Sequence, residues 1–274
     1  SAAGDVNGDG LSDLFVGTYL ADPTGGSDAG KSYVLFGRPN WSALTLTSST
    51  ANGFVINGEA VNDYSGHSIS SAGDVNGDGL ADLIVGAFTA DPSAGVNAGK
   101  SYVVFGTNST SAINLSSLTA GTSTQGFVIN GQSASDNSGV SVSNAGDVNG
   151  DGLADLIVGA SNADLTGAAD GGKTYVVFGK ASGTVVNLTA LGTGGFVING
   201  QSATDNSGTS VSTLGDFNGD GLADLIVGAT GADPQGVSNA GKSYVVFGTT
   251  SSVAIDLSAV SYTHLRAHET GRNL

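Results

Sequence analysis

Short apolar runs separated by polar turns recur along the chain in a fixed order. In one unit, residues 156–160, 173–179 and 196–200 form nearly continuous runs of β-branched, aliphatic and aromatic residues, and residues 185–188 form a looser stretch. Residues 209–212 alternate between polar and apolar side chains instead. Continuous runs are typical of strands covered on both faces, and alternation is typical of strands with one solvated face. The pattern predicts an all-β protein of small antiparallel sheets packed face to face.

The same order of runs occurs about four times, with a period of about 70 residues. We place the units near residues 1–71, 72–144, 145–213 and 214–260, with four strands in each. A unit of this size is typical of the blades of a β-propeller. A β-solenoid repeats every 20–30 residues or so, and no sustained 3.6-residue pattern supports a helical solenoid.

Each unit also contains one nine-residue acidic segment, which begins at Asp5, Asp74, Asp147 or Asp216. Side-chain oxygens stand at positions 1, 3, 5 and 9, a glycine stands at position 6, and the leucine at position 7 can offer its carbonyl. The predicted metal ligands are Asp5, Asn7, Asp9, Leu11, Asp13, Asp74, Asn76, Asp78, Leu80, Asp82, Asp147, Asn149, Asp151, Leu153, Asp155, Asp216, Asn218, Asp220, Leu222 and Asp224.

An oxygen-only ligand set favours Ca²⁺, which accepts six to eight oxygens in a tolerant geometry. We therefore expect about four calcium sites. The loops contain no Cys or His, which argues against zinc. An EF-hand is also excluded, because its bidentate glutamate at position 12 is replaced by valine, as at Val158. The alternative is that these Asp, Asn and Gly residues form four ordinary turns without metal.

Composition restricts the partners. The chain has 274 residues, 24 acidic and 8 basic, and a formal net charge of −16. Half of the acidic residues are the loop aspartates. Such a surface repels phosphate, so we expect no nucleic-acid partner. No apolar run approaches the roughly 20 residues that span a bilayer, so we expect no membrane insertion in this segment.

Residues 138–143 (Ser-Gly-Val-Ser-Val-Ser), 145–152 (Ala-Gly-Asp-Val-Asn-Gly-Asp-Gly) and 155–160 (Asp-Leu-Ile-Val-Gly-Ala) resemble the FG-GAP repeat of integrin α-subunit propellers and bacterial surface proteins. The resemblance covers residues 1–260. It implies a seven-bladed ring with calcium between the first and second strands of a blade, so this chain is expected to be a fragment of a longer propeller; the alternative is an intact four-bladed ring. The name-giving Phe-Gly is Ser-Gly here, and the proline of "GAP" is missing, as at Ser161.

Residues 261–274 differ abruptly in composition and resemble translated adapter or cloning sequence. We regard this tail as non-native. Its histidines, His264 and His268, are therefore not counted as candidate ligands.

Most acidic turn residues outside the loops recur in each unit, so we expect them to be structural. A ligand site should instead differ between units, as Tyr19, Tyr64, Phe88 and His67 do. We predict ligand binding by Tyr19, Tyr64 and Phe88. The repeat region holds one histidine and no cysteine, so no nucleophile beside a base is recognisable and we expect no enzyme.

We therefore expect a calcium-binding extracellular or cell-surface propeller module for adhesion or ligand binding. Its expected partners are an extracellular protein or glycan and the other domains of a longer parent chain. The alternatives are an accessory or catalytic propeller of a secreted polysaccharide-active enzyme, or a structural spacer.

Overall fold

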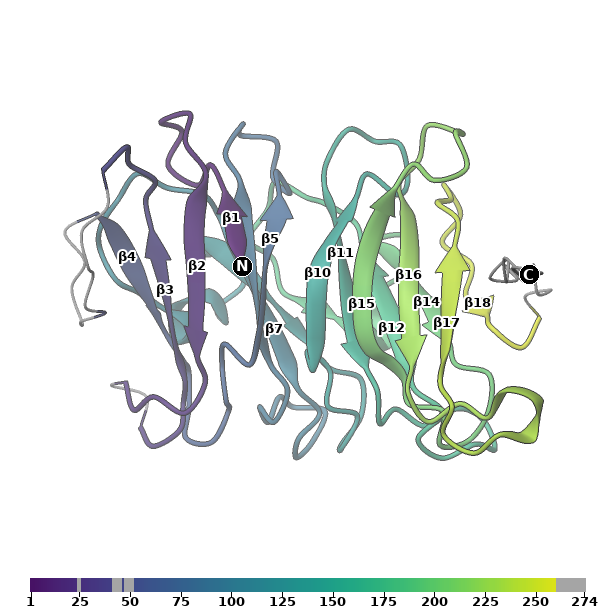
Figure 1. Cartoon of the computed structure of the whole chain (residues 1–274). Helices are drawn as coiled ribbons and strands as arrows, with labels where there is room; N and C mark the ends of the chain where they lie inside the picture. The colour runs from purple at the N-terminus through teal and green to yellow at the C-terminus, as the bar shows by residue number, and fades with distance from the viewer. Residues whose placement is uncertain (24–25, 41–45, 47–51, 260–274) are drawn as a thin grey trace, which may run out of the picture.

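The computed structural model describes residues 1–23, 26–40, 46 and 52–259. Its regular elements are strands apart from three short 3-10 helices, and the strands form four sheets in chain order (Figure 1). The 3-10 helices are η1 (Leu115–Leu118), η2 (Leu188–Ala190) and η3 (Pro234–Gly236). No helix in these residues is long and apolar enough to cross a membrane.

Three sheets have five strands and share one plan. The first contains β1 (Ala2–Gly4), β2 (Asp13–Thr18), β3 (Lys31–Leu35), β4 (Gly53–Asn57) and β8 (Ile113–Asn114). The second contains β5 (Ser68–Gly73), β6 (Asp82–Ala87), β7 (Lys100–Val104), β9 (Gly126–Asn130) and β13 (Val186–Asn187). The third contains β10 (Ser141–Gly146), β11 (Asp155–Ala160), β12 (Lys173–Val177), β14 (Gly195–Asn199) and β18 (Ile255–Asp256). The fourth contains β15 (Ser207–Gly215), β16 (Asp224–Ala229) and β17 (Lys242–Val246).

The second and third strands of a sheet lie at its centre, and their apolar runs explain this position. Every residue of β6 and β7 is buried. The two strands pair antiparallel, with Val85 opposite Tyr102. Because both faces are covered, the prediction of strands buried on two sides is confirmed.

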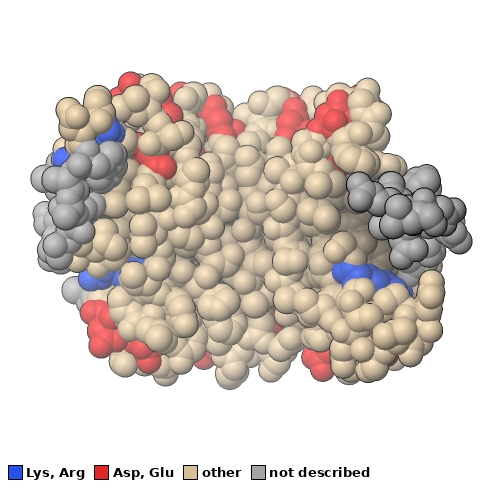
Figure 2. Space-filling model, viewed as in Figure 1, with Lys and Arg blue, Asp and Glu red and all other residues tan. Residues whose placement is uncertain are grey.

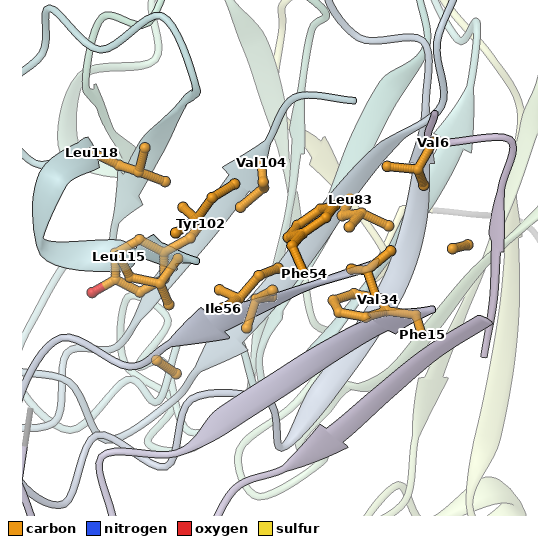
Figure 3. Close-up of a cluster of buried hydrophobic side chains, with 14 of the residues drawn as sticks. Val6, Phe15, Val34, Phe54, Ile56, Leu83, Tyr102, Val104, Leu115 and Leu118 are labelled. Carbon is orange, nitrogen blue, oxygen red and sulfur yellow. The ribbon is translucent and has the colours of Figure 1, made fainter. Parts of the chain in front are cut away.

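Neighbouring sheets share hydrophobic cores. The core between the first two sheets combines Val34 and Phe54 of the first with Leu83 and Tyr102 of the second (Figure 3). Similar cores lie between the second and third sheets and between the third and fourth. The first strands β1, β5, β10 and β15 also pack against one another in turn. This is the stacking of propeller blades, so the predicted fold class is confirmed.

The four blades form an open array, with the first and fourth at opposite ends (Figure 1). Leu14 of the first blade is 43% exposed, whereas Leu83 at the equivalent position of the second is buried. At the other end, Phe217 is 62% exposed, whereas the equivalent Val148 is buried. The outer faces of the first and fourth blades are therefore uncovered in the described residues. The total of seven blades stays a prediction.

The fifth strand of each complete sheet comes from the next unit. Val186 and Asn187 of β13 run parallel to Ile129 and Asn130 of β9. The side-chain amide of Asn130 donates to Oδ1 of Asn187 over 2.9 Å. In the sequence, residues 185–188 form only a loose apolar stretch, which does not predict this link. Each complete blade is thus held at its outer edge by the following one.

The chain reverses at two opposite faces of the array. The acidic loops lie together on one face, which is the upper edge in Figures 1 and 2. The turns between second and third strands lie on the opposite face, with the connections between blades. The second, third and fourth sheets each begin with a strand that starts in the sequence unit before it, so residues 68–73 belong to the second blade. The tail at residues 261–274 lies outside the described residues.

Candidate functional site

Hydrogen bonds within each acidic loop fix its shape. In the third loop, Oδ1 of Asp147 accepts the backbone N–H groups of Gly150 and Asp151 at 2.7 and 3.1 Å. Its Oδ2 accepts the N–H of Gly152 at 2.9 Å. Gly150 and Gly152 have φ of 79° and 89°, which favours glycine. The same bonds recur in the other three loops. The first aspartate therefore organises the loop.

The ninth position lies beneath the loop. Asp155 is buried, and its oxygens accept the N–H groups of Val148 and Gly179, both at 2.8 Å. Burial raises the pKa of Asp155 to about 6, which its two backbone bonds partly oppose. Burial likewise raises the pKa of the equivalent Asp82 to about 7. These carboxylates tie each loop to the turn after the third strand.

The side-chain oxygens of each loop are of the chemical type that binds a hard cation, and they lie close together in the sequence. Asp147, Asn149 and Asp151 stand on one short loop, and an ionised carboxylate keeps lone pairs beyond those used by amides. However, no three carboxylate, histidine or cysteine side chains of the described residues form a group that could hold a metal ion. In each loop the amide of position 3 donates to the carboxylate of position 5, over 2.9 Å between Asn149 and Asp151. A cation at these positions has to compete with that bond, so the predicted ligand set stays a prediction.

On the opposite face, the structure brings Tyr19, Tyr64 and Phe88 together, and it adds His67. The ring centroids of Tyr19 and Tyr64 are 6.2 Å apart, and those of Tyr64 and Phe88 are 6.0 Å apart. The ring centroid of His67 lies 5.3 Å from that of Tyr19 and 4.7 Å from that of Phe88. Tyr19 is 42% exposed, His67 is exposed, and Tyr64 and Phe88 are half-buried. We call these four residues the aromatic cluster; it lies at the junction of the first two blades.

Tyr64 occupies a backbone position that elsewhere holds asparagine. Its φ is 51°, and the equivalent Asn137 and Asn206 have φ of 54° and 51°. Asparagine tolerates this left-handed conformation, whereas a bulky side chain there is an outlier. Asn137 also donates from its amide to the carbonyl of Phe88 at 3.2 Å. Tyr64 therefore adopts an unfavourable backbone conformation, and it lacks the side-chain amide that makes this hydrogen bond at Asn137.

The comparisons with known proteins support the repeat assignment. A sequence profile described as "FG-GAP repeat" matches residues 1–35, 65–104, 138–177 and 207–246, which is more than half of the chain. The chain belongs to the FG-GAP repeat family. The second, third and fourth matches each run from a Ser-Gly at or just before the first strand to the end of the third strand. The fourth strand and the parallel strand of the three five-stranded FG-GAP blades fall outside the matches.

Two known proteins contain segments similar to this chain. The chain is 28% identical to integrin alpha-PS2 of Drosophila melanogaster over 84% of its own length. It is 33% identical to phosphatidylinositol-glycan-specific phospholipase D of Bos taurus over 38% of its length. It spans only 15% of the first relative and 12% of the second.

The recurrent aspartates on the lower face of the FG-GAP blades are structural, as predicted. Oδ1 of Asp22, Asp91, Asp164 and Asp233 accepts the N–H of the residue six positions later. Asp63, Asp136 and Asp205 each accept the N–H of the residue three positions earlier, at 3.1 Å. Both sets close turns.

Sequence reasoning missed a polar contact that joins consecutive FG-GAP blades. Oε1 of Gln132, which follows the fourth strand of the second blade, accepts from Nζ of Lys173 at 3.0 Å and from the hydroxyl of Tyr175 at 2.6 Å in the third. Glu59 accepts from Lys100 and Tyr102 in the same way, and Gln201 from Lys242 and Tyr244. The sequence does contain a signal for this contact, because Lys-x-Tyr and Asn-Gly-Gln or Asn-Gly-Glu recur in the units.

A cavity beside the third acidic loop was also missed. It has a volume of about 660 Å³ and lies between the third acidic loop and residues 178–194. Lys180 lines it, and burial lowers the pKa of this lysine to about 8. The ammonium group lies 4.1 Å from the ring centroid of Phe127. Lysine here replaces Thr107 and Thr249 of the neighbouring units.

Proposed function

We propose that this chain is part of an extracellular or cell-surface FG-GAP propeller that binds a protein or glycan ligand through the aromatic cluster and is stabilised by calcium at its four acidic loops. The observation that carries the ligand site is the aromatic cluster itself. Two exposed rings, Tyr19 and His67, and two half-buried rings gather there at one blade junction, on the face opposite the acidic loops.

The backbone of Tyr64 supports a functional reading of this cluster. A strained conformation persists when the surrounding structure enforces it, and such residues are frequent at binding sites. At the other two blade junctions the equivalent positions hold asparagines, Asn137 and Asn206, which tolerate this left-handed backbone conformation. The matching integrin alpha-PS2 segment supports the extracellular location of the proposal, since an integrin is a cell-surface protein.

Calcium is the metal that the loop chemistry supports best. A bound ion would supply positive charge that offsets the carboxylates at loop positions 1 and 5. In the third loop, Asp147, Asn149 and Asp151 provide side-chain oxygens, the carbonyl of Leu153 is a fourth donor, and Asp155 supports the loop from below. The proposed role is mechanical, because fixing the loop fixes the first and second strands on either side of it.

The ligand site is tested with the substitution Tyr64→Asn, which restores the residue of the other blades. We expect weaker binding to a glycan microarray and to plates coated with extracellular-matrix extract, and an unchanged or higher melting temperature. Phe217→Asn is the control, because it removes an exposed ring that lies outside the cluster. Equal binding by wild type and Tyr64→Asn would reject the aromatic cluster as the ligand site and favour a structural spacer.

A second candidate is an accessory or catalytic propeller of a secreted enzyme. The partial match to a phospholipase D favours it, because it shows a related segment within an enzyme. For a polysaccharide-active enzyme, one assay of the chain with soluble polysaccharides distinguishes a catalytic role from an accessory role. A catalytic role predicts release of reducing ends, whereas an accessory role predicts binding without hydrolysis.

A further inference from the structure

The cavity beside the third acidic loop has no part in the function proposed above. Its volume of about 660 Å³ is within the range of small-molecule sites. Its walls come from the acidic loop, from residues 177–180 at the end of β12 and from the segment 190–194 before β14. Residues 184–187, which include β13 at the edge of the second blade, form a further wall. The cavity therefore lies at the junction of the second and third blades.

The second unit shows what enlarges this cavity. There the equivalent residues, among them Thr107 and Gln125, line a cavity of only about 100 Å³. Gly194 stands in the place of Gln125, so the third unit lacks a long side chain at that wall. The wall is still fixed, because the N–H of Gly194 donates to the carbonyl of Leu191, and its carbonyl accepts the N–H of Phe178, both at 2.9 Å. The cavity is therefore preformed.

Lys180 is the second difference, since Thr107 and Thr249 occupy its place in the neighbouring units. Its ammonium group donates to the carbonyl and the hydroxyl of Thr184 and lies over the ring of Phe127. An ammonium has three N–H groups, and no acceptor among the described residues takes the third. No acidic side chain of the same residues makes an ion pair with it. A half-buried charge of this kind favours an anionic ligand.

The neutral polar groups of the cavity suit a sugar. The side-chain N–H groups of Asn187 and the hydroxyl of Thr193 have no hydrogen-bond partner among the described residues. A sugar ring offers hydroxyl groups on all sides, which matches donors and acceptors that come from separate segments of the wall. Val185 and Leu191 add apolar surface. Asp151 also lines the cavity, so a second negative charge on the ligand would be unfavourable.

We propose that this cavity binds an acidic oligosaccharide that carries one carboxylate. The carboxylate pairs with the ammonium of Lys180, and sugar hydroxyls bond to Asn187 and Thr193. Because a charge-assisted hydrogen bond is stronger than one between neutral groups, this contact selects the acidic sugar over a neutral one. The site is separate from the aromatic cluster, which lies on the face opposite the acidic loops, and it does not depend on the function proposed for that cluster.

A purely structural role of Lys180 is the competing interpretation, because its contact with Phe127 links the third unit to the second blade. The neighbouring units have threonine at this position, so the fold does not require a lysine there. Lys180→Thr separates the two interpretations. A binding role predicts weaker binding with little change in melting temperature, whereas a structural role predicts a lower melting temperature with unchanged binding.

The test uses the full chain and aldotriouronic acid, in which one glucuronate is attached to two neutral xyloses. Calorimetric titration should show saturable one-to-one binding that weakens with added salt, and hydrogen exchange should slow in residues 178–194. The methyl ester of this sugar keeps the hydroxyl groups and loses the charge, so it should bind at least about tenfold more weakly. Lys180→Thr should weaken binding of the acid to a similar extent, and Lys180→Arg should retain most of it.

Lys31→Thr is the matched control, because it removes a lysine at the start of β3, outside the cavity. It should leave binding unchanged, and so should Tyr64→Asn. No binding of the acid, equal binding of acid and ester, or equal binding by Lys180→Thr and wild type would overturn the proposal. Binding that is lost in Tyr64→Asn and kept in Lys180→Thr would place the sugar at the aromatic cluster instead. Equally tight binding of acetyl-trialanine, a peptide with one free carboxylate, would overturn the sugar as the ligand.

Discussion

At the scale of single residues, burial in the folded protein raises the pKa of several aspartates. Asp63 is buried, and its carboxylate accepts the N–H of Ala60 at 3.1 Å. Burial raises its pKa to about 6, the charge of Glu59 adds to the rise, and Lys100 opposes it. The carboxyl group therefore prefers its protonated form in the folded protein more than it does in the unfolded chain.

The sign of the resulting pH dependence follows. Between pH 4 and 6 the folded state holds a proton at Asp63 that the unfolded state has released, so this group makes the protein less stable as the pH rises through that window. Asp63→Asn keeps an acceptor and removes the charge. Relative to wild type, it should gain about 1–3 kcal/mol at pH 8 and almost nothing at pH 4.

Urea unfolding at both pH values, at one fixed calcium concentration, checks this expectation. Asp136→Asn should show the same trend, because burial also raises the pKa of Asp136. A difference between Asp63→Asn and wild type that stays constant from pH 4 to pH 8 would contradict the argument.

At the scale of secondary-structure elements, the contact of Gln132 with Lys173 and Tyr175 connects two sheets at a buried position. Tyr175 is fully buried, so its hydroxyl depends on this acceptor. Gln132→Leu leaves two donors without their partner and should cost about 1–3 kcal/mol of unfolding free energy, whereas Tyr175→Phe should cost about 1 kcal/mol. The double variant should lose less than the sum of the two.

Denaturant unfolding of wild type, the two single variants and the double variant completes this double-mutant cycle. Gln132→Glu is the matched control, because Glu59 already makes the same contact with Lys100 and Tyr102 between the first two blades. Strict additivity in the cycle would mean that the contact does not couple the sheets.

The sequence predicted the central strands well, because their period and composition are local properties. It also singled out Tyr19, Tyr64 and Phe88, because they differ from the equivalent residues of the other units, and the fold brings them together; their role in ligand binding stays a prediction. It could not show that His67 joins them, because that depends on how two blades meet. It also missed the pairing of β13 with β9, since a two-residue parallel strand has too few residues to produce a pattern.

At the scale of the whole molecule, stability depends on how well each small sheet is held against the next. The two end faces are uncovered in the described residues, and the acidic loops all lie along one edge (Figure 2). The proposed cation, if it binds only the folded loops, would therefore stabilise every junction from the same side. Its absence leaves like charges such as Asp147 and Asp151 on one short loop, restrained by bonds to backbone amides and Asn149.

We expect calcium to raise the melting temperature of the chelated protein by several degrees, because each site at tenfold excess over its dissociation constant adds about 1.4 kcal/mol. Calorimetric titration should give about four ions per chain, and magnesium should bind more weakly because it sheds water reluctantly. Asp151→Ala should lower the count by one and reduce the calcium-dependent part of the melting shift. Asp170→Asn, which removes an exposed charge outside the loops, should change neither. Because Asp151 also accepts the N–H of Leu153 at 2.9 Å, each variant is compared with wild type in chelator as well as in calcium. The same melting temperature in calcium and in chelator would show that hydrogen bonds alone close these loops.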